Sequence, residues 1–157
     1  MREIKFRGKN YGGIWLYGYL MPAEKPVINK GCKYRISVSP QACTGKDKMV
    51  YEVITDTVGQ FTGLKDKNGR DIYEGDILRS DDYPYSFDEE KDNYYAVVWW
   101  SDDNAAFVAQ TRVASHSKVR GISNGNCEYL GELLLKEEES VFEVIGNIHD
   151  NPELLRP

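Results

Sequence analysis

The sequence lacks the patterns on which several classes of site depend. Its three cysteines and two histidines are widely separated, and no Cys-x-x-Cys pair occurs. Because a zinc site needs a full set of such ligands at close spacing, we expect no bound metal and no cofactor. The odd number of cysteines (Cys32, Cys43 and Cys127) fits free thiols in a reducing cytoplasm.

Long apolar segments are also absent. No stretch approaches the roughly 18 consecutive apolar residues of a membrane-spanning helix, and residues 1–6 do not resemble the apolar part of a signal peptide. Hydrophobic residues make up 41% of the 157 residues and charged residues 29%, which is typical of a globular protein. We therefore expect a cytoplasmic protein with no membrane partner.

Charge is distributed unevenly along the chain. Residues 1–48 hold ten Lys and Arg against three Asp and Glu, a net charge of +7, so the remaining residues carry −12 of the total of −5. A basic N-terminal part is typical of a polyanion-binding surface. Alternatively, the two parts attract each other within a chain or between subunits. We prefer this second interpretation, because the acidic part would repel nucleic acid.

Strong helical periodicity is nearly absent, whereas short β-branched or alternating apolar segments recur along the chain. This pattern predicts an all-β fold. The strands are expected at residues 4–9, 14–21, 34–38, 49–55, 58–64, 77–79, 94–100, 105–111 and 142–148. Loops are expected at residues 81–93 and 113–126. Residues 127–138 fit either a short helix or a strand.

Residues 57–78 contain the clearest turn signal. Asn68-Gly69 is the typical dipeptide of a type I′ turn, in which both central residues have positive φ, so we expect a hairpin there. The carboxylates that follow are Asp71, Glu74 and Asp76. Their simplest role is to accept hydrogen bonds from backbone N–H groups at tight turns. The segment contains no evident nucleophile, general base or phosphate-binding loop, so we predict no catalytic residue.

The first expected hairpin supplies the candidate binding face. If Phe6 and the aliphatic side chains face the core, alternation along the strands places the basic and aromatic side chains on the opposite face. These are Lys5, Arg7, Lys9, Trp15, Tyr17 and Tyr19. Such a face is typical of a platform for single-stranded nucleic acid. In the alternatives, the cations lie over the rings within the chain, or another domain or subunit covers the stripe. We prefer coverage at an interface.

Three segments resemble the YopX family of phage and prophage proteins. The first is residues 2–9 (REIKFRGK) with Trp15 and Tyr17-Gly18. The second is residues 58–69 (VGQFTGLKDKNG), which continues in residues 72–77 (IYEGDI). The third is residues 142–148 (FEVIGNI), followed by residues 151–155 (NPELL). They occur in the family's order at the start, middle and end of the chain.

The resemblance implies a cytoplasmic protein of a mobile element, with a β-rich N-terminal subdomain (residues 1–56) and an SH3-type β-barrel (residues 57–157). It implies no enzymatic activity. We therefore expect a non-enzymatic interaction or assembly protein with an unknown protein partner, and a nucleic-acid-binding accessory protein is the alternative. Segment 94–100 and the stripe at residues 15–19 carry more apolar surface than a small domain readily buries, so we also expect a homo-oligomer.

Overall fold

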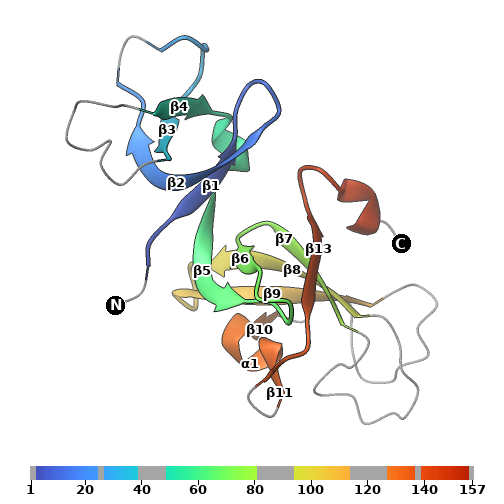
Figure 1. The fold of residues 1–157 in the computed structure, drawn as a ribbon. Coiled ribbons are helices and arrows are strands. Elements are labelled where there is room, and N and C mark those ends of the chain that lie inside the picture. The colour runs from blue at the N-terminus through green and yellow to red at the C-terminus, as the bar shows by residue number, and fades with distance from the viewer. Residues whose placement is uncertain are drawn as a thin grey trace. The chain divides into compact units, whose positions relative to one another are not determined.

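The computed structural model describes residues 3–24, 27–38, 49–80, 94–113, 127–136 and 139–155. These residues are almost entirely strands and turns, with one short α-helix, so the all-β prediction is confirmed (Figure 1). The loops predicted at residues 81–93 and 113–126 lie outside the described residues, apart from Val113. Contacts divide the chain into a first unit, Met1–Gly63, and a second unit, Leu64–Pro157. The predicted domain boundary near residue 56 stays a prediction.

The first unit is built from antiparallel strands in the order β4-β3-β2-β1-β5. Their bounds are β1 Phe6–Lys9, β2 Trp15–Pro22, β3 Tyr34–Ser37, β4 Val50–Val53 and β5 Gly59–Lys65, with the 3-10 turn η2 at Thr55–Thr57. An isolated bridge joins Asn10 to Val53, and the Ile54 N–H donates to the Lys9 carbonyl at 2.8 Å. These contacts bring the end of β4 beside the end of β1.

Strand β2 changes its partner at Gly18. Its first half pairs with β1 in the register Arg7↔Tyr17, and its second half pairs with β3 in the register Tyr19↔Ser37. A Cβ atom at Gly18 would lie 2.0 Å from the Ser37 carbonyl oxygen, and the φ of Gly18 is 157°. This close backbone approach requires glycine, as is common where a strand bends sharply.

The second unit contains a five-stranded antiparallel sheet in the order β10-β9-β8-β7-β13. Its strands are β7 Asp76–Ser80, β8 Tyr94–Ser101, β9 Ala106–Val113, β10 Cys127–Tyr129 and β13 Glu143–Asn147. Strand β6 (Asp71–Tyr73) pairs with the end of β5. The smaller elements are α1 Leu130–Leu134, β11 Leu135–Lys136, β12 Glu139–Ser140 and the 3-10 turn η3 Pro152–Leu155.

Two expectations for the second unit have different outcomes. The described strands form antiparallel sheets and no closed barrel, so the SH3-type barrel is not confirmed. The ambiguous region at residues 127–138 contains both alternatives, because the short strands β10 and β11 flank the single turn of α1.

The hydrophobic core of the second unit lies on one face of its sheet. Strand β8 is the central strand of this sheet, a position for which apolar residues on both faces are typical. Tyr94, Ala96 and Val98 of this strand point into the core, whereas Trp99 is 43% exposed. The buried cluster comprises Ile72, Leu78, Tyr94, Ala96, Val98, Phe107, Ala109, Leu130, Phe142 and Val144.

The hairpin between β5 and β6 has a different turn from the predicted type I′. Gly69 has a φ of 78°, but Ala105 is the only non-glycine residue with positive φ in the described part of the chain. The expectation of positive φ at Asn68 is therefore wrong. The Gly69 N–H donates to the Asp66 carbonyl, and the Asp66 N–H donates to the Arg70 carbonyl, both at 2.9 Å. This is a three-residue loop ending in a left-handed glycine.

The carboxylate of Asp66 explains that geometry. Its Oδ1 accepts the N–H groups of Asn68 and Arg70, both at 2.8 Å, and therefore fixes the turn. Its Oδ2 accepts the N–H of Val144 in β13 at 3.0 Å. Asp66 is only 5% exposed. Its bond from Val144 anchors the hairpin to β13, although the two residues are 78 positions apart in the sequence.

Candidate functional site

Strands β1 and β2 bring four of the six predicted binding residues together. Arg7 lies opposite Tyr17, and Lys9 lies opposite Trp15. Directly opposite residues of an antiparallel pair share a face of the sheet. The Arg7 guanidinium carbon lies 4.9 Å from the centre of the Trp15 ring, and the Lys9 Nζ lies 5.9 Å from it. The cations therefore lie over an aromatic ring of their own chain.

The other two residues of the predicted face have different neighbours. The Lys5 Nζ lies 4.4 Å over the Phe61 ring and 3.3 Å from the Glu3 carboxylate. Tyr19 follows the bend at Gly18, where β2 pairs with β3 instead of β1. The six residues therefore do not share one set of neighbours.

Exposure separates Arg7 from the two tyrosine rings of this hairpin. Arg7 is only 3% exposed, whereas Tyr17 is 47% and Tyr19 39% exposed. A buried guanidinium over a ring is an intramolecular cation–π contact. The surface of the hairpin therefore presents tyrosine rings more than the Arg7 charge.

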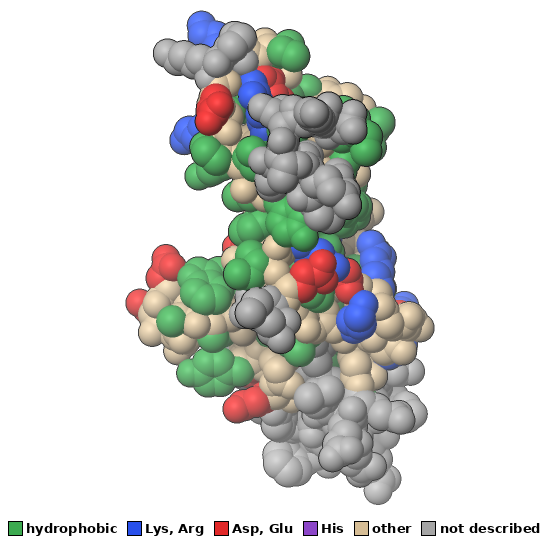
Figure 2. All heavy atoms as spheres, turned by 60° about the vertical axis from the view of Figure 1, so that its left-hand side comes forward, with side chains coloured by type: hydrophobic (Ala, Val, Ile, Leu, Met, Phe, Trp, Pro, Cys, Tyr) green, Lys and Arg blue, Asp and Glu red, His purple; other side chains and the backbone are tan. Residues whose placement is uncertain are grey.

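Exposed apolar side chains are concentrated in the first unit. Of the 14 large hydrophobic side chains that are exposed in the described residues, nine belong to it. They are Ile4, Tyr11, Ile14, Tyr17, Tyr19, Ile28, Tyr34, Met49 and Tyr51. Figure 2 shows hydrophobic side chains at the molecular surface. Single exposed apolar residues are normal. Tyr17 and Tyr19, two residues apart on β2, are the candidates for an interaction surface.

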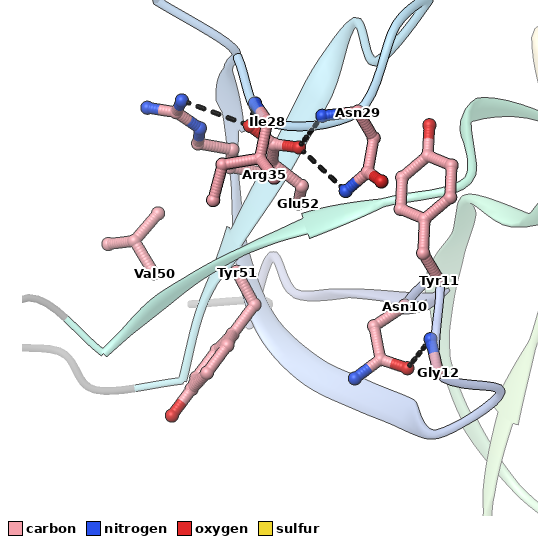
Figure 3. A pocket seen from close by; sticks show the side chains of 9 residues that line it. All are labelled: Asn10, Tyr11, Gly12, Ile28, Asn29, Arg35, Val50, Tyr51 and Glu52. Carbon is pink, nitrogen blue, oxygen red and sulfur yellow. Dashed lines mark hydrogen bonds and ion pairs between the residues drawn. The ribbon is translucent and has the colours of Figure 1, made fainter. Parts of the chain in front are cut away.

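A hollow of about 340 Å³ also lies in the first unit (Figure 3). Four segments line it: the turn after β1, the loop between β2 and β3, strand β3 and strand β4. The lining residues are Asn10, Tyr11, Gly12, Ile28, Asn29, Arg35, Val50, Tyr51 and Glu52. Sequence reasoning missed this site, because it does not indicate which loop approaches β4.

Glu52 of β4 is bonded to the loop and to β3, which also line this hollow. Its Oε1 accepts the Ile28 N–H at 2.7 Å and an Arg35 guanidinium N–H at 3.3 Å. Its Oε2 accepts both the backbone N–H and the side-chain amide of Asn29, at 2.8 and 2.9 Å. The only hint in the sequence was an acidic residue within the apolar segment 49–55.

Two ionisable side chains that line the hollow, Glu52 and Tyr11, have shifted pKa values. The Ile28 N–H, together with the Asn29 and Arg35 donors, outweighs burial and lowers the pKa of Glu52 to about 2. Desolvation, with Cys32 and Glu52 nearby, raises the pKa of the Tyr11 hydroxyl. Near neutral pH, Glu52 is therefore ionised with four donors on its two oxygens, and Tyr11 keeps its proton.

Two features are absent from the described residues. No group of three or more His, Cys, Asp and Glu side chains there is arranged to hold a metal ion. No helix there is long and apolar enough to cross a membrane.

Comparisons with known proteins place this all-β chain in a family. Residues 5–156 match the family described as YopX protein, so the chain belongs to the YopX family. A crystal structure of protein EF1440 from Enterococcus faecalis is similar, with a TM-score of 0.50 and 25% sequence identity over 99% of this chain and 100% of that chain. No curated protein matches. The family is therefore established, whereas these matches name no activity.

Proposed function

We propose that this YopX-family member is a non-enzymatic interaction or assembly protein of a phage or another mobile element, which acts in the cytoplasm as a homo-oligomer. The observation that carries the proposal is the exposure of Tyr17 and Tyr19 beside the buried Arg7. Exposed rings on a hairpin whose Arg7 is buried suit a protein interface better than a phosphate backbone.

The charges of the two units support association between copies. Residues 1–63 carry ten Lys and Arg against five Asp and Glu, a net charge of +5, so residues 64–157 carry −10 of the total of −5. Opposite charges on two units of one chain favour a head-to-tail contact between copies. An SH3-type barrel formed by residues 57–157 belongs to the same proposal, with the chain's β-rich composition as its support.

Site-specific photo-cross-linking tests this function. A photoreactive phenylalanine analogue replaces Tyr17 or Tyr19 in cells that carry the mobile element, and replaces the exposed Asn68 of the second unit as the control. We expect covalent adducts with protein from positions 17 and 19 and few from position 68. Equal yields at all three positions, or no adducts at positions 17 and 19, would contradict the proposal.

A nucleic-acid-binding accessory protein is the second candidate. It is favoured by Lys9 beside Trp15 in a unit with a net charge of +5. Affinity for a single-stranded 20-nucleotide DNA would then fall steeply between about 50 and 200 mM salt. Lys9→Ala should weaken this binding, and Lys67→Ala in the second unit should not. Undetectable binding at low salt would exclude this candidate.

A further inference from the structure

The second unit has an aromatic row on its five-stranded sheet, formed by Trp99, Val108 and Tyr129. Trp99 and Tyr129 both lie directly opposite Val108, so the three residues share one face of β8, β9 and β10. Trp99 is 43% exposed and Tyr129 is 48% exposed. Val108, in the middle of the row, is only 2% exposed. The two rings therefore form the surface of the sheet at this place.

The aromatic row points away from the core of the second unit. Val98 and Ala109, which adjoin Trp99 and Val108 along their strands, belong to the buried cluster. Because successive side chains of a strand point to opposite faces of the sheet, Trp99 and Val108 lie on the other face. The exposed rings are therefore additional to the core that holds this unit together.

An acidic turn borders the aromatic row. The Tyr129 hydroxyl donates to the Asn104 Oδ1 at 3.4 Å, and the Asn104 amide donates to the Ser101 Oγ at 2.9 Å. These bonds hold the turn between β8 and β9 beside the Tyr129 ring. Asp102 and Asp103 of this turn are exposed, and neither forms an ion pair within the described part of the chain. The row is therefore bordered by negative charge.

The first unit has the opposite charge beside its exposed tyrosine. Lys9 lies opposite Trp15, and Tyr17 is two residues further along β2, so Lys9 and Tyr17 share a face of the hairpin. A tyrosine beside a cation in one unit thus complements two rings beside two carboxylates in the other. The net charges of +5 and −10 have the same signs as these local groups.

We propose that the exposed tyrosines of the first unit in one copy dock onto the aromatic row of the second unit in another copy. Such a contact is heterologous, because each copy contributes one surface of each kind. Contacts between two identical surfaces are disfavoured, since Asp102 and Asp103, or Lys9, would then face like charges. Trp and Tyr side chains often dominate the binding energy of an interface. The inference rests on the proposed function and names the surface that receives the tyrosines.

Two full-length variants, each lacking one surface, test this inference. Tyr17→Ser/Tyr19→Ser removes the first surface, and Trp99→Ser/Tyr129→Ser removes the second. Light scattering at low salt and high micromolar concentration should give a mass of 18.0 kDa for each variant alone. An equal mixture of the two should form a dimer of about 36 kDa, twice 18.0 kDa, because only one pair of intact surfaces remains.

The matched control is Ile148→Ser/Leu154→Ser. It removes two other exposed apolar side chains of the second unit, 38% and 37% exposed, and should associate like the wild type. Circular dichroism melting checks that every variant folds.

Charge reversal tests the border of the aromatic row. Asp103→Lys should weaken self-association about tenfold, and adding Lys9→Glu to it should restore most of the affinity, because the two charges are exchanged. Asp56→Lys is the control, because it changes the net charge equally but adds the positive charge to the first unit. It should not weaken association.

Cross-linking gives a readout with the aromatic row intact, which remains valid if Trp99→Ser/Tyr129→Ser fails to fold. Isotope-labelled copies with a photoreactive phenylalanine analogue at position 17 are mixed with unlabelled wild type. Mass spectrometry should find labelled position 17 joined to unlabelled peptides that contain residues 99–104 or residue 129.

The outcomes separate this inference from the proposed function. Association that is lost in Tyr17→Ser/Tyr19→Ser but kept in folded Trp99→Ser/Tyr129→Ser would overturn the inference and leave the proposed function standing. The inference also fails if the mixture stays at 18.0 kDa or if position 17 joins only other peptides. Association that persists in both variants, or a monomeric wild type, would contradict the inference and the proposed homo-oligomer together.

Discussion

The two units use their apolar residues in different ways. Among the described residues, the second unit buries 13 hydrophobic side chains and the first unit buries four: Cys32, Ile36, Val53 and Phe61. The first unit nevertheless exposes nine of the 14 large apolar side chains at the surface, and it carries the positive net charge. The comparison shows that the second unit contributes most of the buried apolar side chains and the first unit most of the exposed ones.

Each unit also uses a buried carboxylate to fix a distant backbone segment. Glu52 accepts the N–H groups of Ile28 and Asn29 in the first unit, and Asp66 accepts the N–H of Val144 in the second. Bonds from backbone N–H groups to a carboxylate are stronger than bonds between neutral groups. In the first unit the bonded carboxylate lines the hollow beside β4, and in the second unit it joins a hairpin to β13.

Replacement of Asp66 should have the largest effect on stability. Asp66→Ala removes the acceptor of three backbone N–H groups, of which that of Val144 is buried, and should lower the free energy of unfolding by about 4 kcal/mol. Urea denaturation measures this change. A loss below about 1 kcal/mol would show that water replaces the carboxylate.

Asp66→Asn separates the two roles of this side chain. Asparagine keeps one carbonyl oxygen, which can still accept the N–H groups of Asn68 and Arg70 in the turn. Its amide group can only donate, so the bond from Val144 is lost. We expect a free energy of unfolding, measured by urea denaturation, that is lower than that of the wild type and higher than that of Asp66→Ala.

Gly18→Ala should have the next largest effect, and it acts on the first unit. The new Cβ would lie 2.0 Å from the Ser37 carbonyl oxygen, so β2 and β3 must separate. We expect a loss of about 3 kcal/mol. Gly31→Ala is the control, because Gly31 has a φ of 90° but no atom within 4 Å of its added Cβ. Equal losses in the two variants would contradict the close approach at Gly18.

A smaller, pH-dependent effect is expected from Glu52→Gln. The pKa of Glu52 is about 2 in the folded protein against an ordinary value of 4.5, so the unfolded chain takes up the proton more readily. The ionised carboxylate therefore stabilises the fold fully above pH 4.5, and this contribution is lost as the pH falls toward 2. The difference in stability between wild type and Glu52→Gln, measured with urea, should shrink over that range. A constant difference would contradict the lowered pKa.

The sequence predicted those features of the fold that depend on neighbouring residues. Alternating and β-branched segments located most of the strands. The glycine of Asn68-Gly69 was placed correctly in a left-handed conformation, but the turn type was not. The turn type differs because the Asp66 carboxylate accepts the Asn68 N–H in the turn and also the Val144 N–H of β13.

Contacts between distant residues account for what the sequence did not predict. Alternation placed Arg7, Trp15 and Tyr17 on one face, but it did not predict the burial of Arg7 over the Trp15 ring. Likewise, the bonds of Glu52 reach residues 23 and 24 positions away, and no local pattern records them. The hollow is lined by four separate segments, so it becomes visible only in the folded unit.

The central claim is that the exposed tyrosines of the first unit form an association surface. Light scattering of the purified protein at low salt tests it most directly, with the wild type compared with the double variant Tyr17→Ser/Tyr19→Ser. We predict a mass above 18.0 kDa for the wild type and a mass of 18.0 kDa for the variant. A wild-type monomer at high micromolar concentration, or equal masses for the two proteins, would contradict the claim.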